Sequence, residues 1–465
     1  MSIEKRTKAT PPTTDREYIY SSWAQVLPNA LFINLKHLVA LRRRAAASQV
    51  IFFVLASLFI SLPLAILGLI GMITGEIGGG IFSFILGGIS FYLIKRVSKR
   101  FRYGGKLARI IARIFGLMVL VCFIVGWFQP ENDLSIWEKL LGLFLYGGLI
   151  FYLWKNSFKK NRVQDIKAEL IHWGIPGFPM LGRPLRTQKL QQIGPKRHSL
   201  RISWKVVFSY FLVFFVFLLF ITQLLLRSAG YNFIIIILII GVWLIRSAAR
   251  NLRTAQKIAA INAEEALKLD KRAPVLFLRS FKDDSAVKII PRYADKRNTV
   301  ELINPNIAFD ESIVAQLEQV GPVVAVGKPG EALPPLGALR MYLADDAWQA
   351  RVLQLMQDSR LIVLLLGETL GLQWEISQIF KLGYAHKSVF YMPPVPLAEK
   401  QKRWQILHNY FTTHLDLSIP KQIPTHLLAF IPNFAHQVIL IENEREDERA
   451  YEVATEVAVA VIERQ

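Results

Sequence analysis

Long apolar stretches fill the first half of the chain. Six separate runs cover Val50–Ile73, Ile81–Ile94, Ile114–Phe128, Leu140–Trp154, Val206–Leu226 and Tyr231–Ile245. A helix needs about 20 mainly apolar residues to cross a bilayer, and the first and fifth runs satisfy this alone. The second run is the weakest because it is rich in glycine, although glycine in lipid more often marks close helix packing than a loop. The pattern predicts about six transmembrane helices over residues 49–250.

Basic residues between the runs fall on one side of the membrane if the chain starts inside. The basic segments that share this side are Lys5–Arg44, Lys95–Arg113, Lys155–Arg201 and Arg246–Lys257. Such a bias is typical of cytoplasmic loops, and an odd number of spans would place one of these segments outside. We therefore expect a multi-pass protein of the inner (plasma) membrane with both termini cytoplasmic. Ionisable residues are almost absent within the runs, which disfavours a transporter.

The last 200 residues show a different pattern, in which short apolar runs alternate with helical periodicities. The expected strands are Val275–Leu278, Pro322–Val326, Leu361–Leu366, Ser388–Tyr391 and Val438–Ile441. The expected helices are Phe309–Val320, Asp346–Gln357, Thr369–Gly383, Lys400–His414 and Arg449–Glu463. Uninterrupted apolar strands that alternate with helices are typical of a parallel sheet covered on both faces. The sequence predicts a flavodoxin-like α/β fold of about five strands, with Leu361–Leu366 near the centre.

Charge divides the chain at the same place. Net charge is +21 overall, mean hydropathy is +0.33 and 52% of the residues are hydrophobic. Residues 1–269 carry a net charge of +24 and residues 270–465 a net charge of −3. A nucleic-acid-binding protein would concentrate its basic residues on the soluble part, so we expect no nucleic-acid partner. The single cysteine, Cys122, excludes a disulfide framework.

We therefore divide the chain into four parts. A basic cytoplasmic segment covers residues 1–48, the membrane region covers 49–250, a connecting helix covers 251–269 and a cytoplasmic α/β domain covers 270–465. Within the first part, Leu31–Leu41 is a short amphipathic stretch that either lies on the inner leaflet or forms an ordinary juxtamembrane helix. The lipid bilayer is the first expected partner.

Three polar segments follow the first three apolar runs of the α/β domain. They are Arg279–Asp284, Gly327–Arg340 and Gly367–Glu375, in which Thr369 is placed as a helix N-cap. Ligands of parallel α/β sheets bind outside the carboxyl ends of the strands. Each segment alone is readily explained as a turn, a rigid loop or a solvated helix. Together on one edge they form a candidate site.

These segments resemble the Toll/interleukin-1 receptor (TIR) domain over about residues 273–465. The family opens with a strand and a motif like F-L-S-F-x-x-x-D, and residues 277–284 read F-L-R-S-F-K-D-D. The loop Gly327–Arg340 is similar to the family's loop after its second strand. The family's third motif starts a helix as S-x-W-C-x-x-E. Counted from Thr369 as the cap, Glu375 holds the glutamate position, whereas the tryptophan is displaced to Trp374 and the cysteine is missing.

The resemblance implies that Glu375 is the catalytic residue if this chain cleaves NAD, as some family members do. Rupture of the nicotinamide–ribose bond develops oxocarbenium character, which one carboxylate stabilises while it holds the ribose hydroxyls. The implied substrate-binding residues are Arg279, Ser280, Phe281, Asp284, Lys328 and Trp374. The aromatic ones would stack on nicotinamide and the cationic ones would meet the pyrophosphate. NAD would be the substrate, and no metal or other cofactor is needed.

Three functions remain open at this point. The chain is a membrane-anchored NAD glycohydrolase of the kind used in bacterial defence, a non-catalytic scaffold that self-associates through its soluble domain, or a sensor that binds a nucleotide there. The enzyme requires Glu375 to face a pocket together with Arg279–Asp284. A scaffold tolerates a filled or shallow site. We expect a homo-oligomer that forms through the soluble domain, with a nucleotide as a further candidate ligand.

Overall fold

The computed structural model describes the chain in several stretches. They are residues 31–101, 263–280, 287–290, 307–318, 320–327, 338–341, 348–414, 419–432 and 438–463, with a few single residues between 102 and 262. The chain divides into two compact units. One comprises Met1–Leu35 and Pro184–Gln465, and the other comprises Lys36–Arg183.

The second unit begins with one helical path that is interrupted once. Helix α2 (Lys36–Ala56) passes into the π-helical turn η1 (Ser57–Ser61), and α3 (Leu62–Ile73) follows directly. Pro63 stands in the first turn of α3. Proline has no backbone N–H, and its ring collides with the carbonyl four residues earlier, so the α-helical ladder cannot continue through it. A π-bulge is a usual way to absorb such a break.

Helices α3 and α4 (Ile77–Phe101) form a tight antiparallel pair. The turn between them uses Gly75 at φ 93°, a conformation that costs glycine little. The backbones approach so closely that a Cβ on Gly68 would lie 2.5 Å from the amide nitrogen of Phe84, and a Cβ on Gly87 2.9 Å from that of Ala65. The prediction that glycines of the second run serve packing is confirmed for Gly87. Gly88, by contrast, faces open space.

One described helix is long and apolar enough to cross a membrane. It is the portion Ile77–Lys95 of α4, which belongs to the run that looked weakest in sequence, while Leu62–Met72 is a shorter apolar helix. Many large apolar side chains of α4 are exposed, among them Phe82 and Tyr92. The third to sixth apolar runs lie almost entirely outside the described residues, so the six-span arrangement stays a prediction.

The first unit is built on an eight-stranded mixed sheet with the order β1-β10-β9-β8-β7-β2-β5-β6. Its strands are β1 (Leu31–Asn34), β2 (Val275–Leu278), β5 (Val323–Val326), β6 (Leu339–Met341), β7 (Leu361–Leu365), β8 (Ser388–Tyr391), β9 (Leu427–Pro432) and β10 (Val438–Glu442). A separate antiparallel pair consists of β3 (Lys288–Ile289) and β4 (Ile307–Ala308). Every residue of β7 is buried, and β7 lies in the middle of the sheet, as predicted.

The sequence predicts a parallel sheet of about five strands. The sheet has more strands than that, and one of them is antiparallel. The five predicted strands exist and all run the same way. However, β9 lies between β8 and β10 and is antiparallel to both. Two further strands, β6 and β1, extend the sheet at its two edges in parallel pairings. The result is a mixed sheet in which the order β5-β2-β7-β8 keeps the flavodoxin-like core.

The N-terminal segment contributes strand β1. Its residues pair with β10, from Leu31 opposite Ile439 to Asn34 opposite Glu442, and Leu35 N–H donates to the carbonyl of Glu442 at 2.9 Å. Ile33 and Leu35 are fully buried. The stretch Leu31–Leu41 is therefore not one amphipathic helix, because it starts as a strand and becomes helical only at Lys36.

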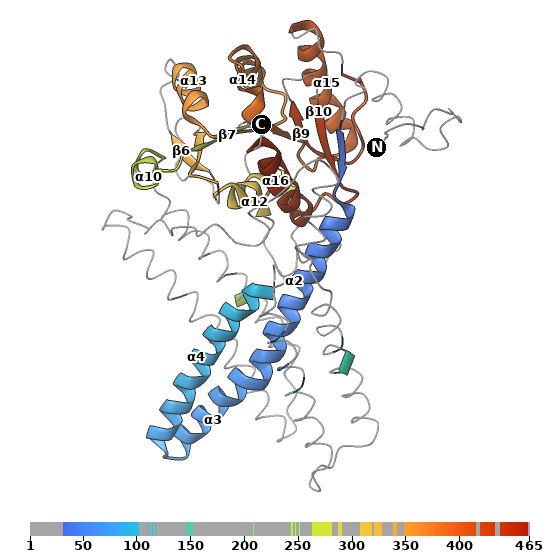
Figure 1. Cartoon of the computed structure of the whole chain (residues 1–465). Helices are drawn as coiled ribbons and strands as arrows, with labels where there is room; N and C mark the ends of the chain where they lie inside the picture. Colours follow the sequence, from blue (N-terminus) through green and yellow to red (C-terminus); the bar gives the residue numbers. More distant parts are fainter. Residues whose placement is uncertain are drawn as a thin grey trace, which may run out of the picture. The chain divides into compact units, whose positions relative to one another are not determined.

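Helices cover both faces of the sheet (Figure 1). The helices α13 (Trp348–Asp358), α14 (Leu370–Lys381) and α15 (Leu397–His414) pack on one face, while α12 (Phe309–Leu317) and α16 (Glu448–Ile462) share the other. Adjacent residues of β8 show the alternation. Phe390 stacks with Phe380 of α14, whereas the Tyr391 hydroxyl donates to Thr455 Oγ1 of α16 at 3.0 Å.

Candidate functional site

The sheet has two places where parallel strands send their following helices to opposite faces. One lies between the neighbouring strands β2 and β7, and the other lies between β8 and β10, which the antiparallel β9 separates. After β2 the chain leads to α12 on one face, while β7 leads to α14 on the other. In the same way, β8 leads to α15 and β10 leads to α16. Such points open a crevice at the carboxyl edge, where α/β proteins bind ligands. We call them the β2/β7 edge, where the sequence placed the candidate site, and the β8/β10 crevice.

At the end of β2, Arg279 forms a buried ion pair with Asp310 in the first turn of α12. Its guanidinium also lies 5.9 Å from the centre of the Phe277 ring. Burial raises the pKa of the Asp310 carboxyl, and the positive charge of Arg279 opposes that rise. The pair ties β2 to the helix on one face of the sheet. The pyrophosphate contact expected of Arg279 stays a prediction, and the next residue, Ser280, is also buried.

On the other side of the β2/β7 edge, Glu375 lies in the second turn of α14, the helix that follows the central strand. Thr369 occupies the N-cap position as expected, although its side chain makes no capping hydrogen bond. The side chain of Glu375 is half-buried, but its Oε2 atom is fully buried and has no hydrogen-bond partner among the described residues. Loss of solvent raises the pKa of Glu375 to about 8. A carboxyl with this pKa is mostly neutral at pH 7.

Trp374 precedes Glu375 in α14, and its ring makes a packing contact. Its ring meets that of Trp348 of α13 edge-on, with centroids 4.9 Å apart and planes at 70°. Both rings pack against the main hydrophobic core. An edge-to-face pair of this kind contributes about 1 kcal/mol beyond the burial of its area. In the described arrangement Trp374 therefore fixes α14 on α13.

The candidate residues that the structure describes thus belong to the segments that follow the neighbouring strands β2 and β7. Within the described chain no hydrogen bond links the Oε2 atom of Glu375 to Arg279 or Ser280. The other expected substrate-binding residues, Phe281, Asp284 and Lys328, lie outside the described residues. Convergence of the whole set around a substrate stays a prediction.

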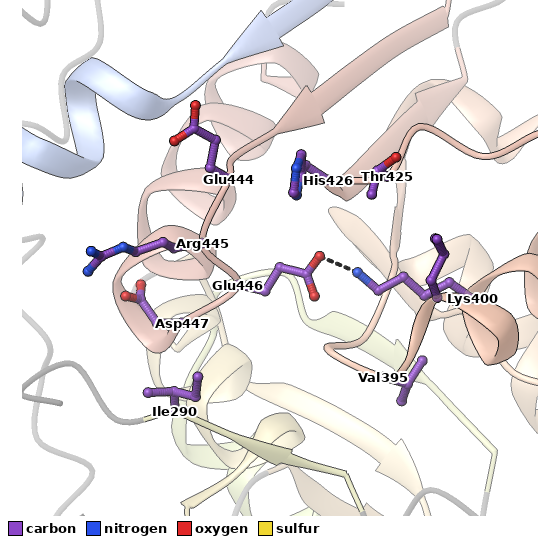
Figure 2. A pocket seen from close by; sticks show the side chains of 10 residues that line it. Ile290, Val395, Lys400, Thr425, His426, Glu444, Arg445, Glu446 and Asp447 are labelled. Carbon is purple, nitrogen blue, oxygen red and sulfur yellow. Dashed lines mark hydrogen bonds and ion pairs between the residues drawn. The ribbon is translucent and has the colours of Figure 1, made fainter. Parts of the chain in front are cut away.

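Sequence reasoning missed a cavity of about 490 Å³ in the β8/β10 crevice (Figure 2). Its wall is formed by Ile290, Val395, Leu397, Lys400, Thr425, His426, Glu444, Arg445, Glu446 and Asp447. Lys400, which is almost completely buried, pairs across the cavity with Glu446. Two signals were present in the sequence: the proline-rich segment 393–396 after one strand, and the charged segment 444–449 after another.

The described residues offer no ready set of metal ligands. No group of three or more His, Cys, Asp or Glu side chains suited to a metal ion occurs among the residues that the structure describes. Comparison of the chain with protein-family models, with curated proteins and with solved structures finds no match. The case for a function therefore depends on the residues of the β2/β7 edge and of the β8/β10 crevice.

Proposed function

We propose that this chain is a membrane-anchored, TIR-like signalling or defence protein that cleaves NAD at the nicotinamide–ribose bond, with Glu375 as its catalytic carboxylate. One observation carries the proposal. The Glu375 Oε2 atom is buried without a hydrogen-bond partner among the described residues, and its pKa is about 8. A carboxyl in a structural role is normally paired, because an unpaired buried polar group costs free energy. Perturbed groups of this kind concentrate at functional sites.

The raised pKa fits the chemistry in a specific way. The nicotinamide ring of NAD is cationic, and a cation close to a buried carboxyl favours its ionised form. Substrate binding would thus convert a neutral Glu375 into the carboxylate that stabilises the developing oxocarbenium ion. Without substrate the site stays uncharged, which keeps the buried carboxyl compatible with a stable fold.

The test is NAD consumption by the full-length protein in lipid nanodiscs. The full chain is needed because β1, from residues 31–34, completes the sheet and is absent from a fragment that starts at residue 270. We expect kcat/KM to rise with pH through about 8, since its profile reports the essential group of the free enzyme. Glu375→Gln should lower turnover at least about 100-fold.

The matched control is Glu368→Gln, an exposed glutamate seven positions earlier. It should leave both the rate and the pH profile unchanged. Unaltered NAD turnover in Glu375→Gln would exclude this mechanism. If the wild-type protein consumed no NAD at any pH between 6 and 9, the scaffold or sensor function would take the place of the enzyme.

A further inference from the structure

The β8/β10 crevice has features of a ligand site that are independent of Glu375. Its volume of about 490 Å³ lies within the range of roughly 300–1,000 Å³ that small-molecule sites occupy. Residues from four separate segments form its wall, and the amino ends of both α15 and α16 reach it. It also lies outside the carboxyl ends of β8 and β10, the edge of the sheet at which α/β folds bind ligands.

Lys400 is the most informative residue of this wall. Only 3% of its side chain is exposed, and its ammonium has one partner among the described residues, Glu446, whose side chain is 20% exposed. An ammonium carries three donors, so two remain for another acceptor. Lys400 also lies near the amino end of α15, where the helix dipole disfavours a cation. Helix stability therefore does not explain its position.

The amino end of α15 adds backbone donors next to Lys400. Residue 396 precedes the helix, and as a proline it offers no side-chain acceptor to cap it. Its carbonyl accepts from the amides of Glu399 and Lys400 at 2.9 and 3.0 Å. In the described part of the chain, the amides of Leu397 and Ala398 have no backbone acceptor. Free N–H groups at a helix amino end attract anions.

The wall has three acidic residues, Glu444, Glu446 and Asp447, and the last two have their partners within the described chain. Glu446 pairs with Lys400, and the Asp447 carboxylate accepts from the Ala450 amide at the start of α16 at 2.9 Å. Because Glu446 is the more exposed member of its pair, it can turn toward solvent when another anion reaches Lys400. The apolar side chains of Ile290 and Val395 lie in the lower part of Figure 2, and Leu397 is a third apolar residue of the wall.

We propose that the β8/β10 crevice is a second ligand site, which takes a small organic phosphate monoester. The phosphate binds Lys400 and the first amides of α15, displacing Glu446. The organic body lies against Ile290, Val395 and Leu397. This site is separate from the NAD site, so the two proposals stand or fall independently.

The experiment measures binding to the full-length protein in nanodiscs by thermal unfolding and titration calorimetry. The probes are AMP and phenyl phosphate. Adenosine, which is AMP without its phosphate, is the control compound. We expect at least one phosphate ester to raise Tm and adenosine to bind at least about tenfold more weakly, because the charge-assisted bonds to the phosphate are lost. Lys400→Gln should weaken ester binding at least about tenfold, and Glu446→Gln should leave it equal or tighter.

Lys402→Gln is the matched control, because it removes the same charge from an exposed position of α15. Lys402→Gln and Glu375→Gln should both bind the phosphate esters as tightly as the wild type does. If Lys400→Gln unfolds, the double variant Lys400→Gln/Glu446→Gln keeps the pair neutral and should still lose the ester. The proposal is overturned if neither ester binds, if adenosine binds equally well, or if Lys400→Gln behaves like Lys402→Gln. Loss of ester binding in Glu446→Gln would also overturn it, because that result indicates a cation site.

Discussion

At the scale of single residues, the burial of Glu375 should make the stability of the α/β unit depend on pH. Its folded-state pKa is about 8, compared with 4.5 for an ordinary glutamate. Between these values the unfolded chain has released its proton while the folded chain retains it, so stability falls as pH rises. Each pH unit of this window costs about 1.4 kcal/mol, and the whole window about 5 kcal/mol at most.

Glu375→Gln removes this titration. We expect the variant to be more stable than the wild type at pH 8.5 and to differ less at pH 5, with melting temperatures from tryptophan fluorescence as the measurement. Glu368→Gln, at an exposed position, should follow the wild type at both pH values. Equal effects of Glu375→Gln at pH 5 and pH 8.5 would contradict a raised pKa.

At the scale of elements, the sequence predicted best those strands that are covered on both faces. Strand β7 is apolar throughout because helices lie on both of its sides, and it was recognised with almost its true limits. Strand β9 is equally apolar but ends at Pro432, and proline within a run argues against a strand. The structure accepts Pro432 because it stands at the strand end, opposite Val438. Strand β6 has only three residues, too few to show a pattern.

The site could be predicted only in part for a similar reason. The sequence could single out Glu375 as a candidate because the motif of the resembled family fixes its distance from a helix start, and its role stays a prediction. The cavity around Lys400 could not be found by spacing, because its residues come from segments separated by about 150 positions and meet only through the sheet order. Likewise β1 pairs with a strand some 400 residues away, and no local pattern indicates such a partner.

The glycines of α3 and α4 give a prediction at the same scale. A Cβ on Gly68 would lie 2.5 Å from the Phe84 backbone, so Gly68→Ala must push the two helices apart. Overpacking of this kind costs about 1–3 kcal/mol. Gly88→Ala is the control: it adds the same methyl group to α4 where nothing lies within 4 Å. We expect thermal unfolding in nanodiscs to show a lower Tm for Gly68→Ala and no loss for Gly88→Ala. Equal Tm values would indicate that the helices are not in close contact.

At the scale of the whole molecule, the pairing of β1 with β10 constrains the membrane topology. Strand β1 comes before α2, and β10 belongs to the last part of the chain, yet the two are hydrogen-bonded neighbours in one sheet. Both must therefore lie on the same side of any membrane that the chain crosses between them. The number of crossings is then even, whatever its value. Charge gave the same answer independently, because an even number keeps all basic segments on the inner side.

This constraint can be tested by cross-linking the two strands in the membrane. Phe32 and Leu440 are direct partners in the sheet, and neighbouring strands lie about 4.8 Å apart, within the Cα separation that a disulfide accepts. Cys122 is the single native cysteine, so Cys122→Ala gives a clean background. We expect Phe32→Cys/Leu440→Cys to form an internal disulfide on mild oxidation of membranes. Phe32→Cys/Ile441→Cys, whose side chains leave opposite faces of the sheet, should form far less of this disulfide.

A reporter fused after Gln465 should then score as cytoplasmic, together with one fused before Met1. Opposite locations of the two reporters, or equal cross-linking of the two cysteine pairs, would refute the shared sheet and with it the even number of spans.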